Sequence, residues 1–214
     1  MGVGKVLHDH SGHAAAFDHP RGYDLLAEVA FLGRRREMFL RLAGLAGVRP
    51  GDRVLDVGCG TGYLSRILGA LAGADGQVTG VDPAAAMIEY ARRRAPLNCT
   101  YVVGEGQSLD LPDESFDVVV SSLAVHHIPD EERGAAVREM FRVLRPGGRL
   151  LIAEYRPPAH PLLARLAALV TGPAMRHDTR ALLAELVPQA GFRVEDRGDL
   201  PVALHYIRAS RPAA

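Results

Sequence analysis

The stretch from Val54 to Leu64 constrains the fold of this chain more than any other. The β-rich run 53–57 follows the turn-forming residues 50–52, which predicts a buried strand entered from a turn. After it, glycines and then apolar residues at the spacing of one helix face occupy Gly58, Gly60, Gly62, Leu64, Ile67, Leu68 and Leu71. This order predicts the first half of a nucleotide-binding βαβ unit. Glycines needed only for tight strand–helix packing are the alternative.

The charges around the glycine loop indicate what kind of ligand it would hold. The spacing G-x-G-x-G brings the third glycine one residue earlier than the dinucleotide fingerprint, which seats a pyrophosphate. Asp56 ends the predicted strand, where its carboxylate would repel a pyrophosphate and attract an ammonium group. Asp82 follows the next predicted strand, 77–81, and is placed to accept both ribose hydroxyls. We therefore expect a ligand with adenosine at one end and a cationic amino acid at the other.

Four motifs together resemble a known family. They are V-L-D-V-G-C-G-T-G at 54–62, the acidic Asp82, F-D-V-V-V-S-S at 116–122 and L-R-P-G-G-R-L at 144–150. The set is similar to class I S-adenosylmethionine-dependent methyltransferases, in the small-molecule branch that includes ubiquinone/menaquinone-type enzymes. The resemblance covers about residues 36–210. It implies S-adenosyl-L-methionine as cofactor, S-adenosyl-L-homocysteine as product, and a small-molecule acceptor methylated on O, N or C.

The resemblance also implies roles for individual residues. Asp56 and the glycine loop would hold the methionine end, Asp82 the ribose, and the residues after the third strand the adenine amine, where the family more often has Asp than Glu. The second serine of the fourth strand has an alternative, a hydroxyl bonded to its own backbone. The cofactor-binding set is Asp56, Gly58, Cys59, Gly60, Asp82, Pro83, Glu105, Gly106, Ser121 and Ser122.

Methyl transfer from a sulfonium needs alignment and exclusion of water, and a base when the acceptor carries a proton to be removed. His127 follows the fourth predicted strand and matches the histidine that phosphoethanolamine-type methyltransferases pair with a tyrosine from an N-terminal flap. Tyr23 is the candidate for that tyrosine. The alternative is that His126 and His127 only cap and pack the next helix. We expect no metal site, although H-x-H-x-x-H at 8–13 has ligand spacing.

The alternation of predicted strands and helices gives an α/β fold with a doubly wound, Rossmann-like sheet. Family likeness supplies seven strands with the last one antiparallel. We expect an N-terminal helical flap at 1–33 and the cofactor-binding domain at 34–210. Asp82 and Asp130 are expected to cap helices, with Pro83 at the first helical position. The His-rich N-terminus and residues 156–177 are expected to roof the acceptor pocket.

Composition limits the other functions. The 25 basic and 25 acidic residues balance, so no phosphate-tracking surface for nucleic acid is expected. Two cysteines exclude a disulfide framework and are too few for arsenite methylation. The longest apolar run, near 162–170, is too short to cross a membrane. We expect a cytoplasmic monomer or homodimer that binds neither nucleic acid nor membrane. A non-catalytic cofactor-binding module, an RNA or protein methyltransferase and a nicotinamide dehydrogenase are the alternatives.

Overall fold

The computed structural model describes residues 20–156 and 179–213. Its sheet has seven strands in the order β3-β2-β1-β4-β5-β7-β6. Strands β1 to β5 run parallel, and β7 runs antiparallel to β5 and to β6. The predicted doubly wound sheet with an antiparallel last strand is confirmed. The elements are α1 (Pro20–Ala30), α2 (Arg35–Ala46), β1 (Arg53–Val57), α3 (Tyr63–Ala72), β2 (Gln77–Asp82), α4 (Ala85–Arg92), β3 (Cys99–Val103), β4 (Phe116–Ser122), η2 (Val125–His127), α5 (Arg133–Val143), β5 (Leu144–Tyr155), α7 (Thr179–Gln189), β6 (Arg193–Leu200) and β7 (Leu204–Ser210).

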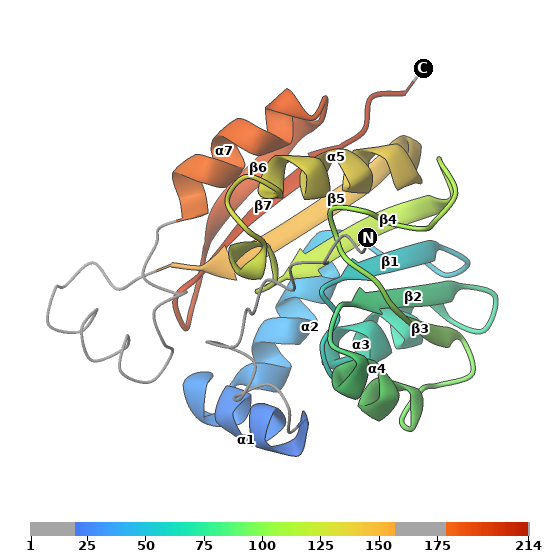
Figure 1. Ribbon diagram of the computed structural model, residues 1–214, viewed down its shortest axis with the longest axis vertical. Coiled ribbons are helices and arrows are strands. Elements are labelled where there is room, and N and C mark those ends of the chain that lie inside the picture. Colours follow the sequence, from blue (N-terminus) through green and yellow to red (C-terminus); the bar gives the residue numbers. More distant parts are fainter. Residues whose placement is uncertain (1–19, 157–178, 214) are drawn as a thin grey trace, which may run out of the picture.

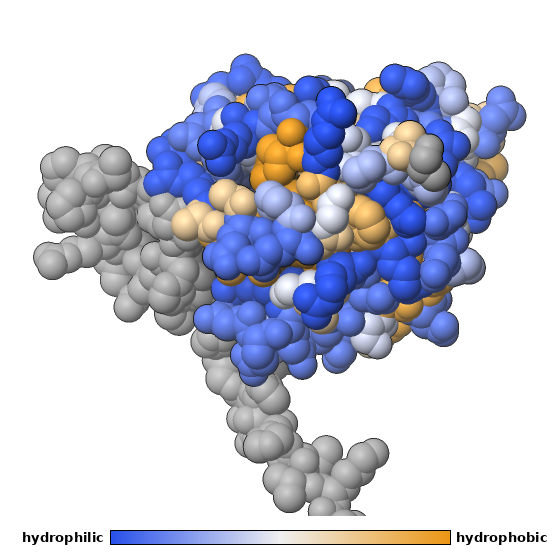
Figure 2. All heavy atoms as spheres, turned by 90° about the horizontal axis from the view of Figure 1, so that it is seen from above, coloured by the Kyte–Doolittle hydropathy of each residue, from blue (hydrophilic) through white to orange (hydrophobic). Residues whose placement is uncertain are grey.

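Helices cover both faces of the sheet (Figure 1). One core lies between the sheet and α2, α3 and α4, with Met38, Leu42 and Leu68 fully buried. The other lies between the sheet and α5 and α7, around Met140 and Leu183. The outer surface over α5 and α7 is largely hydrophilic, with hydrophobic residues gathered near its middle (Figure 2). All residues of β1 after Arg53 and all of β4 before Ser122 are therefore buried, as the almost unbroken apolar run of β4 predicts.

Two predicted helix caps are wrong. Helix α4 begins at Ala85 after Ala84, and no side chain caps it. Asp82 and Pro83 precede the helix, and the Asp82 carboxylate accepts the N–H of Gly60 in the glycine loop at 2.8 Å and that of Ala84 at 2.9 Å. Helix α5 begins at Arg133, three residues after Asp130. The Pro129 carbonyl accepts the N–H groups of residues 132 and 133, so a turn occupies the predicted first helical turn, and Asp130 instead pairs with Arg133 at 2.8 Å.

No helix in the described part of the chain combines the length and apolar content that crossing a membrane requires. We predicted that the His-rich N-terminus and residues 156–177 roof the acceptor pocket. Apart from Arg156, these segments lie outside the described residues, and so does the H-x-H-x-x-H run.

Candidate functional site

The glycine loop lies where the strand order reverses. Strands β1 and β4 are parallel neighbours, but the chain leaves β1 toward β2 and leaves β4 toward β5. Open α/β sheets bind their ligands in the crevice beyond the carboxyl ends of such a pair. The Val81 carbonyl at the end of β2 accepts the N–H groups of both Gly58 and Cys59, at 2.8 and 3.0 Å. The loop is thus fastened across the ends of β1 and β2.

Gly58 is required at the first loop position. Its φ of 76° lies in the left-handed region, and a Cβ built on it would be 2.1 Å from the Cβ of Ala124. No side chain fits at that separation. The segment after β4 consequently packs directly on the glycine loop, which brings residues from two distant parts of the chain to one site.

Asp82 is bound to the loop by its own carboxylate. Its Oδ2 accepts the N–H of Gly60 at 2.8 Å and its Oδ1 accepts the N–H of Ala84 at 2.9 Å. Each carboxylate oxygen can accept a second donor, so capacity for a ligand hydroxyl is left on both. Burial raises the pKa of the Asp82 carboxyl, although the two backbone N–H groups oppose that shift. Pro83 is exposed beside it.

Asp56 is a second carboxyl group, buried beneath the loop. It is 1% exposed, and the Ser65 hydroxyl donates to its Oδ2 at 2.6 Å. The pKa of Asp56 is raised to about 7. Burial is the main cause, the Ser65 hydrogen bond opposes it, and the negative charge of Asp82 adds to it. A buried carboxyl group whose ionisation is disfavoured by burial and by a second carboxylate forms a site where a cation would be stabilised. The negative charge of these two carboxyl groups suits a ligand that carries an ammonium and a sulfonium, and would repel a pyrophosphate.

The two serines at the end of β4 differ. The buried Ser121 hydroxyl donates to the Val57 carbonyl at 2.9 Å and so ties β4 to the end of β1. The Ser122 hydroxyl oxygen is buried and has no hydrogen-bond partner. The alternative of a bond from Ser122 to its own backbone is therefore wrong. An unpartnered hydroxyl at the carboxyl end of β4 fits a site that takes up a polar ligand.

The turn after β3 reaches the same edge of the sheet. A Cβ built on Gly106 would be 3.0 Å from Cγ1 of Val57, so the turn packs against the end of β1. Glu105 is exposed there and accepts a hydrogen bond from Gln107 at 3.0 Å. The structure thus brings the sequence-predicted residues of β1, β2, β3 and β4 to one end of the sheet.

Asp24 connects helix α1 to the glycine loop, and no sequence pattern pointed to this residue. Its carboxylate accepts from the Thr61 hydroxyl in the loop at 2.9 Å and from the Tyr90 hydroxyl in α4 at 3.2 Å. It also pairs at 2.9 Å with Arg35, which is 4% exposed. Burial raises the pKa of the neighbouring Tyr23, and the charges of Arg35, Asp82 and Asp24 act on it too.

The two histidines after β4 occupy different environments. The predicted base, His127, is exposed, and its ring centroid lies 4.0 Å from that of the buried His126. His126 Nδ1 lies 2.6 Å from Oε2 of Glu154, which is fully buried at the end of β5. Sequence reasoning missed Glu154. The signal was a single carboxylate ending the apolar run 150–153. The pairing of His127 with Tyr23 stays a prediction.

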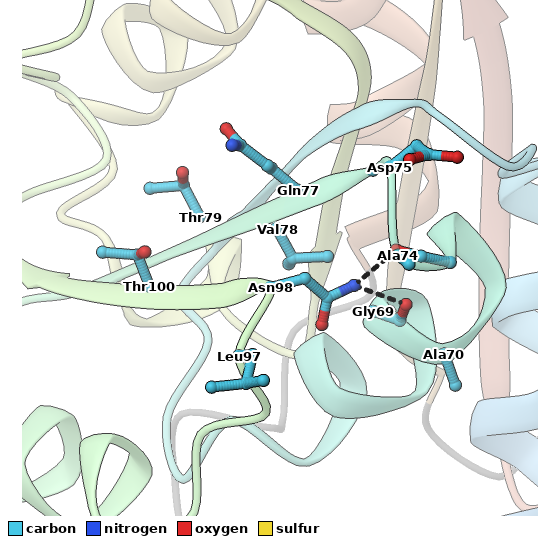
Figure 3. A pocket seen from close by; sticks show the side chains of 12 residues that line it. Gly69, Ala70, Ala74, Asp75, Gln77, Val78, Thr79, Leu97, Asn98 and Thr100 are labelled. Atoms are coloured by element: carbon cyan, nitrogen blue, oxygen red, sulfur yellow. Dashed lines mark hydrogen bonds between the residues drawn. The ribbon is translucent and has the colours of Figure 1, made fainter.

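A separate hollow of about 560 Å³ lies at the opposite end of the strands (Figure 3). It is bordered by the last turns of α3 and the beginnings of β2 and β3. Asn98 closes one side by donating to the carbonyls of Gly69 and Gly73, at 2.8 and 2.9 Å. These bonds fasten the end of α3 to β3 and serve packing. Across residues 20–156 and 179–213, no three His, Cys, Asp or Glu side chains gather as a metal site would need.

Comparison with known proteins agrees with this geometry. Residues 54–148 match the model of a methyltransferase domain. The ubiquinone/menaquinone biosynthesis C-methyltransferase UbiE of Shewanella frigidimarina is 30% identical over 213 residues, covering 86% of this chain and 84% of that protein. This chain belongs to the class I S-adenosylmethionine-dependent methyltransferases of the ubiquinone/menaquinone type. The family's cofactor is S-adenosylmethionine.

Other relatives match a shorter region. The UbiE protein of Ectopseudomonas mendocina is 38% identical over 149 residues, which are 67% of this chain and 57% of that protein. The match therefore spans less than two thirds of that relative. Among solved structures, a SAM-dependent methyltransferase from Aquifex aeolicus has a TM-score of 0.70 at 20% identity, covering 90% of this chain and 98% of that one. That likeness supports the fold.

Proposed function

We propose that this methyltransferase moves a methyl group from S-adenosyl-L-methionine to an O, N or C atom of a small molecule. The observation that carries the proposal is the pair of carboxyl groups, the buried Asp56 and the half-buried Asp82, which flank a glycine-rich loop at the reversal of strand order. This site is electrostatically matched to a cationic amino acid joined to adenosine. It is mismatched to the pyrophosphate of a nicotinamide cofactor.

The residues of the site divide the cofactor between them. Asp56 and the loop backbone at Gly58, Cys59 and Gly60 would hold the amino-acid end, because a carboxylate pairs with its ammonium and the backbone approaches closely. Asp82 would accept the ribose hydroxyls with the capacity left on its two oxygens. The remaining roles, against the adenine and the cofactor's other face, fall to Pro83, Glu105, Gly106, Ser121 and Ser122.

Bound S-adenosylmethionine supplies a methyl group on a positively charged sulfur, which leaves as a neutral thioether. The chain's own contribution is to align the acceptor with that methyl, to exclude water and to hold the proton that the acceptor loses. His127 and Tyr23 are the sequence-predicted residues for the last task. Of the segment 1–33, which we propose as a flap, helix α1 contacts the loop through Asp24.

For the acceptor we propose a hydroquinone-type ring, methylated at carbon. The support is the name of the relatives, C-methyltransferases of ubiquinone/menaquinone biosynthesis. A ring hydroxyl of such an acceptor must lose its proton for the neighbouring carbon to become nucleophilic, so the acceptor needs a base. The balanced charge of the chain, 25 basic against 25 acidic residues, favours a small molecule over RNA.

Calorimetric titration tests the cofactor. We expect S-adenosylhomocysteine to bind the wild type at micromolar concentrations, NADH to give no heat, and Asp82→Ala to lose the binding. Asp75→Ala is the matched control, because Asp75 is exposed in the turn after α3, away from the loop. Equal binding by both variants would remove Asp82 from the site. Binding of NADH with no response to S-adenosylhomocysteine would overturn the proposed function.

Radiolabelled methyl transfer tests the acceptor. We would incubate the protein with methyl-labelled S-adenosylmethionine and 1,4-naphthalenediol, a soluble hydroquinone. Label in a ring-methylated product supports C-methylation, and label in a methyl ether supports O-methylation. Tight binding of S-adenosylhomocysteine without transfer to any hydroquinone, phenol or amine offered would favour a non-catalytic binding module.

A further inference from the structure

His126 and Glu154 form a buried pair at the cofactor end of the sheet. Glu154 Oε2 lies 2.6 Å from His126 Nδ1, and its Oε1 accepts the N–H groups of Ala124 and Val125 at 3.1 and 2.8 Å. The side chains of Glu154 and His126 are 0% and 4% exposed. Because Oε1 accepts both backbone N–H groups, Glu154 acts as an acceptor. In a neutral ring of His126 the proton then lies on Nδ1, which donates it to Oε2.

The other ring nitrogen of His126 is an acceptor without a partner. With the proton on Nδ1, the neutral ring carries its lone pair on Nε2. Nε2 is buried and makes no hydrogen bond. Buried polar groups are nearly always satisfied, and a half-satisfied buried network is less favourable than an apolar core. A carboxylate that orients a histidine whose far nitrogen is unpartnered is the arrangement of a general base.

The pair is held rigidly against the glycine loop. Ala124, which precedes the η2 turn, is the residue on which Gly58 packs. Leu123 has a φ of 56°, a left-handed conformation that is strained for leucine and that turns the chain back after β4. From α5, the Arg133 guanidinium donates to the carbonyls of residues 125, 126 and 128, at 3.2, 3.2 and 2.9 Å. The ring of His126 thus has a fixed position two residues from the loop contact.

Other titratable groups surround the pair. The His127 ring lies tilted against the His126 ring from the same turn, and Arg133 of α5 donates to the His126 backbone carbonyl. On β7, His205 is in register with Glu154 and so shares its face of the sheet. His205 pairs with Asp199 of β6 at 2.9 Å, and the Asp199 side chain is 44% exposed. Histidines and carboxylates therefore alternate from the buried end of β5 to the exposed edge at β6.

We propose that His126 is the general base of the methyl transfer and that Glu154 is the residue that positions it. The proposal rests on the proposed function. It differs from the sequence-based prediction, which assigned the proton to the exposed His127. The chemical class of acceptor that follows is one with an acidic O–H, such as a hydroquinone.

The step balances as follows. The acceptor gives its hydroxyl proton to His126 Nε2 and bonds to the methyl carbon, while the electrons of the old carbon–sulfur bond stay on sulfur. In O-methylation the histidine then passes its proton to water. In C-methylation the ring carbon releases its own proton to water as the hydroxyl regains one from Nε2. Either way, one proton is released for each methyl transferred.

Nitrogen NMR of the histidine rings tests the tautomer without any acceptor. We expect the wild type to show His126 protonated on Nδ1 and unprotonated on Nε2 at neutral pH. In Glu154→Gln the amide can donate to the ring, so the proton should move to Nε2. A wild-type ring protonated on Nε2 alone would overturn the proposal, whether or not 1,4-naphthalenediol proves to be an acceptor.

Kinetics with 1,4-naphthalenediol test the role. We expect Glu154→Gln and His126→Gln to lower kcat about 100-fold or more and to keep S-adenosylhomocysteine affinity within about threefold. His126→Gln should lose the acidic limb of the pH profile, and Glu154→Gln should move it to lower pH. Glu131→Gln is the matched control, because Glu131 is exposed before α5 and has no place in the site, and it should keep both the turnover and the pH profile. Unchanged turnover in folded His126→Gln would overturn the base, while the proposed function would stand. If the wild type does not bind S-adenosylhomocysteine, the proposed methyltransferase function itself is wrong.

Discussion

The pKa of Asp56 makes cofactor binding depend on pH in a way that can be calculated. With the site free of ligand, burial and the charge of Asp82 raise the Asp56 pKa to about 7. A ligand ammonium pairs only with the ionised carboxylate, so at lower pH binding must first remove a proton. If the carboxyl stays ionised in the complex, the dissociation constant of S-adenosylhomocysteine should rise about 30-fold between about pH 8 and about pH 5.5.

Isothermal titration at the two pH values measures this ratio directly. The matched variant is Asp56→Asn, which keeps the size of the side chain and its acceptor for the Ser65 hydroxyl but removes the ionisation. We expect this variant to bind more weakly at pH 8 and to show a much smaller ratio, with the remainder due to Asp82. A wild-type affinity that is the same at both pH values would refute the pairing of Asp56 with the ammonium.

Three further predictions concern stability and the loop. The Asp56 pKa is raised from 3.8 to about 7. The contribution of this group to the free energy of unfolding is therefore full below pH 3.8 and is lost as the pH rises through 7, by at most about 4 kcal/mol. Unliganded Asp56→Asn should therefore exceed the wild type in urea denaturation at pH 8, and an equal difference at pH 4 would contradict this. Gly58→Ala should lose S-adenosylhomocysteine binding and about 1–3 kcal/mol of stability. Its control is Gly44→Ala, where a Cβ meets open space. Equal losses of stability and of binding in the two variants would refute the close contact between Gly58 and Ala124. Asp24→Ala removes the ion-pair partner of the buried Arg35 guanidinium and should lower the free energy of unfolding by about 1–3 kcal/mol. Glu28→Ala, at an exposed position of the same helix, is the control and should change it little. An equal loss in the two variants would refute the stabilising role of Asp24.

The sequence was sufficient for the sheet and for the glycine loop, because both depend on local patterns. The β-rich run at 53–57 marks a buried strand, the almost unbroken apolar run at 116–121 marks a strand covered on both faces, and the glycine spacing marks the loop between strand and helix. Asp56 and Asp82 could be named because each ends such a strand, and parallel strands bring their carboxyl ends together. Sequence position alone therefore located the negatively charged part of the site.

The other parts of the site depend on contacts between residues that are distant in the sequence, and no local sequence pattern predicts such contacts. Asp24 lies in a helix of ordinary composition, and its role follows from reaching Thr61, 37 residues away. Glu154 reaches His126 across 28 residues, so the two histidines could not be told apart from their sequence. Asp82 was expected to cap a helix, but the helix begins only at Ala85, and the Asp82 carboxylate joins the distant Gly60 N–H to that of Ala84.

The bond between Ser121 and Val57 joins residues 64 positions apart, and this separation has a consequence for synthesis of the protein. At about 5–20 residues per second, β4 emerges roughly 3–13 seconds after β1. Through that interval β1 lacks one of its two neighbours, and the segment that packs on Gly58 does not yet exist. A ligand can therefore stabilise only the completed sheet. It cannot guide the pairing of the strands that build its own site.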